Sequence, residues 1–154
     1  MAVVVAQPLY VAEYKSAELG FSITYPDNLD SQSSPFKATV FYAISATKMP
    51  WVTISIVSGA TFQDAVNASF AGSSDASNIA MKAAKDDTTN SGIKVQTAPL
   101  SYSWQGTYDC DGLVLGAQKD GKWILYSIAT VPMYDPGFDL KEYEKILKSI
   151  KLNQ

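Results

Sequence analysis

Two kinds of side chain are missing from this 154-residue chain, and a third is nearly missing. It contains no histidine, and its twelve basic residues are all lysines, so arginine is absent too. Histidine most often serves as general base near neutral pH and is the commonest metal ligand. Arginine makes the bidentate contacts that recognise phosphates and guanine. These absences, on a chain of net charge −3, argue against a nucleic-acid partner and against histidine-based nucleophilic catalysis.

Cysteine occurs once, at Cys110, so the chain forms no internal disulfide, redox pair or cysteine-based zinc site. We expect Cys110 to be a small buried residue on a strand. No stretch approaches the roughly 18 apolar residues of a membrane-spanning helix. The opening segment MAVVVAQPLY is too short in its apolar part for a complete signal peptide or a span.

What is present is the composition of a folded soluble protein. Hydrophobic residues make up 47% of the chain and charged residues 18%, which suits a single packed core. No internal repeat and no linker-like change of composition interrupts the sequence. We therefore predict one domain over residues 1–154.

Strand signals begin early. In GFSITYPDNLD, residues 20–30, Phe21, Ile23 and Tyr25 alternate with polar residues, and Pro26 ends the strand because it cannot donate to a sheet. Residues 9–16 are its expected partner. Segments 37–45 and 51–59 predict a second antiparallel pair, with Val40, Tyr42 and Ile44 on one face. Short strands are expected at 93–97 and 100–104, with Pro99 between them.

The clearest local pattern is a hairpin over residues 112–131. Its turn, 119–122, has Asp-Gly at the centre, a pair that accepts the positive φ of a type I′ turn. Pairing outward from it places Leu115 beside Tyr126 and Leu113 beside Ile128. Since both faces of the hairpin are apolar, it should lie at the centre of the sheet with a covering layer on each side.

Three helices are predicted from apolar residues that recur with helical spacing. The first spans 61–72, with Thr61 as N-cap. The second, shorter one spans 78–85. The third closes the chain with an apolar stripe of Tyr143, Ile146, Leu147 and Ile150, and it begins at Asp135-Pro136 or at Asp139. With the strands, they predict an α+β fold: a mostly antiparallel central sheet flanked by helices in an α/β/α sandwich.

This arrangement resembles the PsbP-like domain. The resemblance is carried by GFSITYP, by the hairpin strand KWILYSIAT, by Tyr134 about eight residues after Tyr126, and by the closing ILKSIKL. It spans roughly residues 9–152. One departure is Leu29, where relatives often have tryptophan. The resemblance implies the same layered sheet and a family of mostly non-enzymatic binding or assembly proteins, among them photosystem II extrinsic subunits, a Ran-binding transport factor and exported prokaryotic proteins.

Two acids provide the candidate metal site. Asp109 and Asp111 flank Cys110 on a predicted strand, and residues two apart on a strand share a face. Carboxylate oxygens suit calcium, which needs several more such ligands than these two. Solvated aspartates at the start of a strand are the alternative. The oxygen-rich residues 86–90 are open to the same two interpretations.

The aromatic residues Tyr102, Trp104 and Tyr108 are the candidate protein-binding residues. They alternate around the start of the hairpin, where core packing explains them equally well unless they are exposed.

From these patterns and the resemblance we expect a non-catalytic module that binds another protein, with no catalytic residues and with calcium as the one candidate cofactor. The resemblance implies an extracytoplasmic or membrane-anchored full-length protein, tethered by a segment that precedes this sequence; a cytoplasmic location stays open. Two other functions compete: an enzyme based on metal or carboxylates, which needs converging acids, and a small-ligand carrier, which needs a sizeable apolar cavity.

Overall fold

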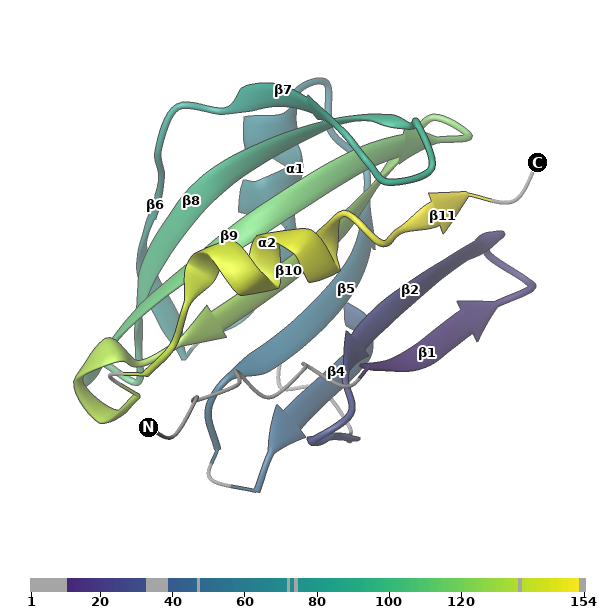
Figure 1. Ribbon diagram of the computed structural model, residues 1–154. Coiled ribbons are helices and arrows are strands. Elements are labelled where there is room, and N and C mark those ends of the chain that lie inside the picture. Colours follow the sequence, from purple (N-terminus) through teal and green to yellow (C-terminus); the bar gives the residue numbers. More distant parts are fainter. Residues whose placement is uncertain are drawn as a thin grey trace, which may run out of the picture.

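The computed structural model describes residues 11–32, 39–46, 48–71, 73, 75–135 and 137–152. They form the expected α+β fold, a large antiparallel sheet with one helix on each face (Figure 1). The elements in chain order are β1 (Val11–Ser16), β2 (Phe21–Pro26), β3 (Leu29–Ser31), β4 (Thr39–Ser45), β5 (Trp51–Val57), α1 (Phe62–Ser69), β6 (Ala76–Met81), β7 (Lys85–Thr88), β8 (Lys94–Trp104), β9 (Tyr108–Lys119), β10 (Lys122–Thr130), a short 3-10 helix η1 (Pro132–Tyr134), α2 (Leu140–Leu147) and β11 (Lys151–Leu152).

Two sheets make up the β part of the fold. The larger has eight strands in the order β3-β4-β5-β10-β9-β8-β6, with β7 pairing β8 beside β6. The smaller has three strands in the order β1-β2-β11. In Figure 1, α1 lies behind the large sheet, whereas α2 lies in front of it. No helix in the described ranges has the length and apolar character needed to cross a membrane.

The β9–β10 hairpin forms the centre of the large sheet, as predicted. Leu115 pairs with Tyr126 and Leu113 with Ile128, and Asp120 and Gly121 have φ values of 53° and 77°. Leu115 and Tyr126 are fully buried on the face covered by α2 and the small sheet, whereas Val114, Trp123 and Leu125 are buried on the face that α1 covers. Both faces of the hairpin are therefore inside the protein.

Helix α1 begins where the capping pattern predicts. The Thr61 side chain accepts a hydrogen bond of 3.1 Å from the Asp64 backbone N–H. The Phe62 ring packs beside the Trp123 ring at a tilt of 34°, with ring centroids 5.6 Å apart. A Cβ on Gly116 would come within 2.5 Å of the Phe62 ring, so only glycine permits this approach. The helix is thereby fixed over the hairpin end of the sheet.

Helix α2 begins at Asp139, whose side chain accepts a hydrogen bond of 3.0 Å from the Lys141 N–H. Ile146 and Leu147 face the core, and the buried Ile150 follows the helix end. β11 then pairs with β2 and so ties the end of the described chain to its beginning. Tyr126 strengthens this layer by donating a 2.7 Å hydrogen bond from its hydroxyl to the Thr24 carbonyl.

The predicted helix at 78–85 is wrong, because the segment contributes strand β6 instead. Its apolar residues have a spacing that fits both structures, and pairing with β8 satisfies the backbone of both segments. A register shift between Ser77 and Ala80, with Asn78 at a φ of 53°, turns Ala76 and Ile79 toward the same core cluster. A bulge of this kind has no simple sequence pattern.

Two further details differ from the sequence prediction. The strands expected at 93–97 and 100–104 form one continuous strand, β8, because Pro99 falls between the residues that pair with β7 and those that pair with β6. Its missing N–H therefore leaves no gap in the ladder. Val40 is 43% exposed instead of sharing the core with Tyr42, because the pairing of β4 with β5 shifts register between Thr39 and Phe41.

Candidate functional site

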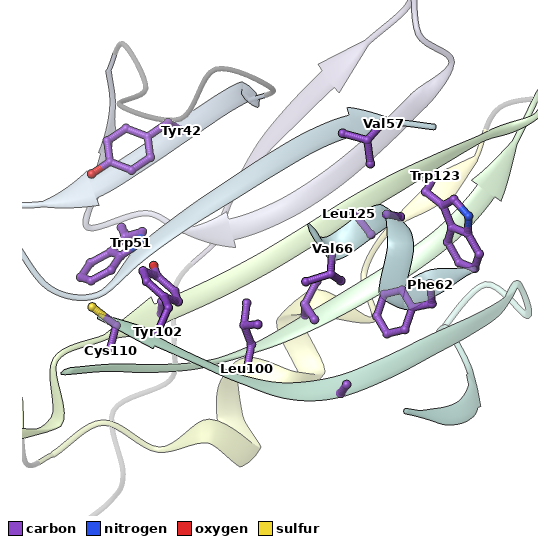
Figure 2. Close-up of a cluster of buried hydrophobic side chains, with 14 of the residues drawn as sticks. Tyr42, Trp51, Val57, Phe62, Val66, Leu100, Tyr102, Cys110, Trp123 and Leu125 are labelled. Carbon is purple, nitrogen blue, oxygen red and sulfur yellow. The ribbon is translucent and has the colours of Figure 1, made fainter. Parts of the chain in front are cut away.

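An open hollow of about 470 Å³ lies on the α1 face of the large sheet, at the end away from the β9–β10 turn. Most of its lining is aromatic or aliphatic, and we call it the aromatic hollow. The described residues that line it are Tyr42, Ile44, Lys48, Met49, Trp51, Trp104, Gln105, Tyr108, Val131 and Tyr134. Figure 2 shows Tyr42, Trp51 and Tyr102 together at this end of the buried cluster, with Phe62 and Trp123 at the other end.

The hollow exists because α1 is short. Its buried residues Phe62, Ala65 and Val66 cover the part of the sheet around Trp123 and Leu125. Beyond the helix, the sheet continues for several residues with apolar side chains on the same face. Tyr42, Ile44, Trp51 and Val131 form a floor there, each 8–9% exposed.

Three chain reversals supply the walls. The turn between β4 and β5 brings Lys48 and Met49, and the turn between β8 and β9 brings Trp104, Gln105 and Tyr108. Gln105 and Gly106 have φ values of 54° and 65°, and the Gln105 N–H donates a 2.7 Å hydrogen bond to the Asp75 carbonyl.

The third wall is η1, which follows β10. Pro132 occupies its first turn, and the Tyr134 N–H donates to the Val131 carbonyl at 3.0 Å. The Thr130 hydroxyl donates to the Asp135 carboxylate at 2.7 Å and holds the end of this turn against β10. Tyr134 is 58% exposed and meets Tyr108 edge-on, with ring centroids 6.2 Å apart. The two rings therefore form one exposed aromatic edge.

The predicted protein-binding residues divide between the wall and the interior. Trp104 and Tyr108 line the hollow, and Tyr108 is 37% exposed. Tyr102 is 5% exposed and contacts Phe70, so its ring belongs to the interior. Burial raises the pKa of Tyr102, while a hydrogen bond with the Trp51 side chain acts in the opposite direction. Tyr102 thus supports the floor residue Trp51 instead of lining the hollow.

Sequence reasoning did not assign Tyr42, Trp51, Lys48 or Tyr134 to this site. The sequence marks Tyr134 only through the resemblance to the PsbP-like domain. Nothing in the local pattern of these residues distinguishes them from core or turn residues, and the four come from two stretches far apart in the chain, residues 42–51 and the η1 turn at Tyr134. The pairing of β5 with both β4 and β10 brings these stretches together.

The candidate metal residues lie on the other face of the sheet. Asp109 and Asp111 are exposed, while Cys110 between them is 1% exposed and faces the α1 side. Burial, together with the two flanking carboxylates, raises the pKa of Cys110 to about 12, so the thiol is protonated at neutral pH. Within the described ranges, no group of three or more His, Cys, Asp and Glu residues is arranged to hold a metal ion. The calcium assignment to Asp109 and Asp111 stays a prediction.

The oxygen-rich residues around 86–90 have a structural role. The Lys148 ammonium group lies 2.9 Å from the Asp87 carboxylate and 3.6 Å from Glu144, and Lys85 lies 3.5 Å from Glu144. The hydrogen bond from Lys148 lowers the pKa of Asp87 and raises that of Lys148. This ion-pair network joins β7 to α2. The polar depression of about 890 Å³ next to it is lined by Asp86, Asp87 and Lys94 among others.

Comparison with known proteins identifies the fold. No protein-family model matches the sequence, and no curated protein matches it either. Among solved structures, the cyanobacterial PsbP of Synechocystis sp. PCC 6803 is similar at a TM-score of 0.62 and 13% identity, covering 99% of this chain and 98% of that one. The sheet, its layers and their order therefore define a PsbP-like fold.

Two other structures are similar at lower scores. A Pseudomonas aeruginosa protein of unknown function has a TM-score of 0.43 and 14% identity, over 90% of this chain and 94% of that chain. A Bacteroides thetaiotaomicron protein has a TM-score of 0.42 and 12% identity, over 92% of this chain and 48% of that chain.

Proposed function

We propose that this protein is a non-catalytic binding module that engages another protein through the aromatic hollow. The observation that carries the proposal is the exposed aromatic edge of Tyr108 and Tyr134 above an apolar floor. Tyrosine and tryptophan are the residues in which binding energy concentrates at protein interfaces. Among the described lining residues, Lys48 alone is charged, so the hollow lacks the paired acid and base of a hydrolytic site.

A photo-crosslinking experiment in the native organism tests the proposal. Benzoylphenylalanine replaces Tyr134 in one variant and Lys122, in the distant β9–β10 turn, in the control. We expect one protein to crosslink at position 134 and not at 122. The purified partner should then bind the wild-type chain, and Tyr134→Ala should weaken binding by at least about fivefold. Binding that is unchanged in both Tyr134→Ala and Tyr108→Ala contradicts the proposal.

A small-ligand carrier is the second candidate function, favoured by the volume of the hollow. At about 470 Å³ it falls within the range of roughly 300–1,000 Å³ that is usual for small-molecule pockets. Native mass spectrometry of protein purified from its source distinguishes the two functions. A bound small molecule that is lost in Tyr134→Ala favours the carrier.

We also propose that the full-length protein works outside the cytoplasm, attached to a membrane by a preceding segment. The support is the resemblance to a family with exported members, together with the PsbP-like fold. Fractionation of the tagged native gene product, followed by protease accessibility, tests it; a tag recovered wholly in the cytoplasmic fraction contradicts it.

A further inference from the structure

The aromatic hollow carries a single positive charge within its largely apolar lining. Lys48 is the one charged side chain among the described lining residues. Its ammonium group has no carboxylate within ion-pair distance in the described part of the chain, although Glu13, Asp87, Glu142 and Glu144 all take part in lysine ion pairs elsewhere. A protein of net charge −3 therefore presents an uncompensated positive charge at this apolar hollow.

The two acids that follow Tyr108 on β9 do not neutralise this charge. Asp109 and Asp111 lie one and three residues after Tyr108. Strand alternation turns both toward the opposite face of the sheet, while Cys110 faces the hollow side. Lys48 thus meets an incoming ligand as a free cation at the edge of an apolar surface.

Backbone geometry singles out the same place. Four non-glycine residues in the described ranges have positive φ: Lys48 at 72°, Asn78 at 53°, Gln105 at 54° and Asp120 at 53°. Asparagine and aspartate adopt this conformation readily, whereas lysine and glutamine do so rarely. Both unusual residues line the hollow and carry its polar side chains. Strained backbone of this kind concentrates at ligand-binding sites.

The shape of the hollow suits a side chain presented by an extended peptide. The floor residues Trp51 and Val131 are only 9% and 8% exposed, so they close the bottom of the hollow with a small apolar surface against which an aromatic ring can pack. Tyr108 and Tyr134 are 37% and 58% exposed on one side, so the hollow is open to solvent and admits a continuous chain. Lys48 lines the same hollow, so its ammonium group is available to a residue that neighbours the bound ring in the peptide.

We infer that the hollow recognises an acidic-aromatic peptide segment of a partner protein, with an aromatic side chain on the apolar floor and an adjacent carboxylate paired with Lys48. This inference rests on the proposed function and specifies the partner's chemistry. Charge complementarity decides against a basic segment, since Lys48 would repel it, and gives an acidic segment an advantage over a neutral one.

Fluorescence polarisation with rhodamine-labelled peptides tests the inference. The probes are Gly-Asp-Phe-Glu-Phe-Asp-amide, its neutral counterpart Gly-Asn-Phe-Gln-Phe-Asn-amide, and Gly-Lys-Phe-Lys-Phe-Lys-amide. We expect the acidic peptide to bind about fivefold more tightly than the neutral one at low salt. This advantage should shrink in 0.5 M salt, because salt screens an ion pair that is exposed to solvent. The basic peptide should bind most weakly.

Matched variants locate the effect. Lys48→Met should abolish the advantage of the acidic peptide and leave the neutral peptide unchanged, whereas Lys122→Met, in the distant turn, should change neither. Tyr134→Ala should weaken both peptides, whereas Met133→Ala, which alters a side chain 81% exposed beside it, should not. Thermal unfolding of each variant confirms that it is folded.

Any other outcome overturns the inference, and the combination of results shows whether the proposed function fails as well. Equal binding of acidic and neutral peptides, unaffected by Lys48→Met but weakened by Tyr134→Ala, overturns the acidic preference and leaves the proposed function intact. No peptide binding, with Lys48-dependent binding of indole-3-propionate, overturns both in favour of a small-ligand carrier. A preference for the basic peptide, or no binding of any probe, overturns the inference as well.

Discussion

The two faces of the large sheet are covered to different extents. One face lies under α2 and the three-stranded sheet, where Leu115 and Tyr126 of the large sheet and Phe21 of the covering β2 are completely buried. The other face has a single eight-residue helix, α1, and beyond its end the floor residues of the aromatic hollow keep 8–9% of their surface exposed. The same alternation of apolar residues thus builds a sealed core on one side and an accessible apolar surface on the other. Coverage, not the strand pattern, distinguishes the sealed face from the open one.

The largest expected effect comes from breaking the sealed face. Phe21→Ala removes a ring with no exposed surface, so we expect a loss of about 3–5 kcal/mol in the free energy of unfolding. Tyr134→Ala, at the exposed edge of the hollow, should change it by less than about 0.5 kcal/mol. Urea unfolding followed by circular dichroism measures both. Equal losses would show that the hollow is as much a part of the core as the sealed face.

A smaller effect on stability tests how α1 packs against the sheet. Gly116→Ala introduces a Cβ within 2.5 Å of the Phe62 ring, so we expect a loss of about 1–3 kcal/mol from overpacking. Phe62→Leu leaves room for that methyl group, so the double variant should lose less than the sum of the single changes. Additive losses in urea unfolding would mean that contact with Phe62 does not set the distance between α1 and the sheet.

The rim of the hollow should gain stability when its backbone strain is removed. Gln105→Gly replaces a residue with a φ of 54° by one that adopts this conformation freely, and we expect a gain of about 0.5 kcal/mol. The matched change Asp120→Gly, at a φ of 53° in the distant hairpin turn, should give a smaller gain because aspartate tolerates positive φ. Thermal unfolding compares the stability of the two variants. Equal gains would show that the backbone at Gln105 is no more strained than the backbone at Asp120.

The weakest expected effect concerns the ion pair that joins β7 to α2 on the sealed side. Asp87 has a pKa below its ordinary 3.8, so its contribution is present above that pH and is lost as the pH falls through the lowered value. Lys148 has a pKa above its ordinary 10.5, so its contribution persists until the pH rises through the raised value. Asp87→Asn should therefore destabilise the protein by no more than about 1 kcal/mol between roughly pH 5 and 9.

As the pH falls through the lowered pKa of Asp87, the difference between Asp87→Asn and wild type should shrink and then vanish, because both side chains become neutral. In a Lys148→Met background, Asp87→Asn should have little effect at any pH. A difference between Asp87→Asn and wild type that does not shrink on acidification would contradict the assignment of the lowered pKa to this pair.

Local sequence rules were sufficient to predict the structure wherever the interacting residues are close in the sequence. The Asp120-Gly121 turn sets the register of β9 with β10, and Thr61 caps α1 as its position predicts. The α+β class with its antiparallel sheet follows from these segments and from the resemblance to the PsbP-like domain. They were predictable because turn chemistry, capping and alternation act over a few residues.

Long-range pairing decided the rest. The segment 76–81 has spacing that suits a helix or a strand, and the free edge of β8 selects the strand. Trp104 and Tyr108 line the hollow while Tyr102, on the same side of the same sheet, is covered, because the outcome depends on how far α1 and Phe70 extend. The sequence by itself determined which side chains are apolar and how each strand presents them. Only the tertiary structure decided which of them remain uncovered, since covering a surface requires elements from distant parts of the chain.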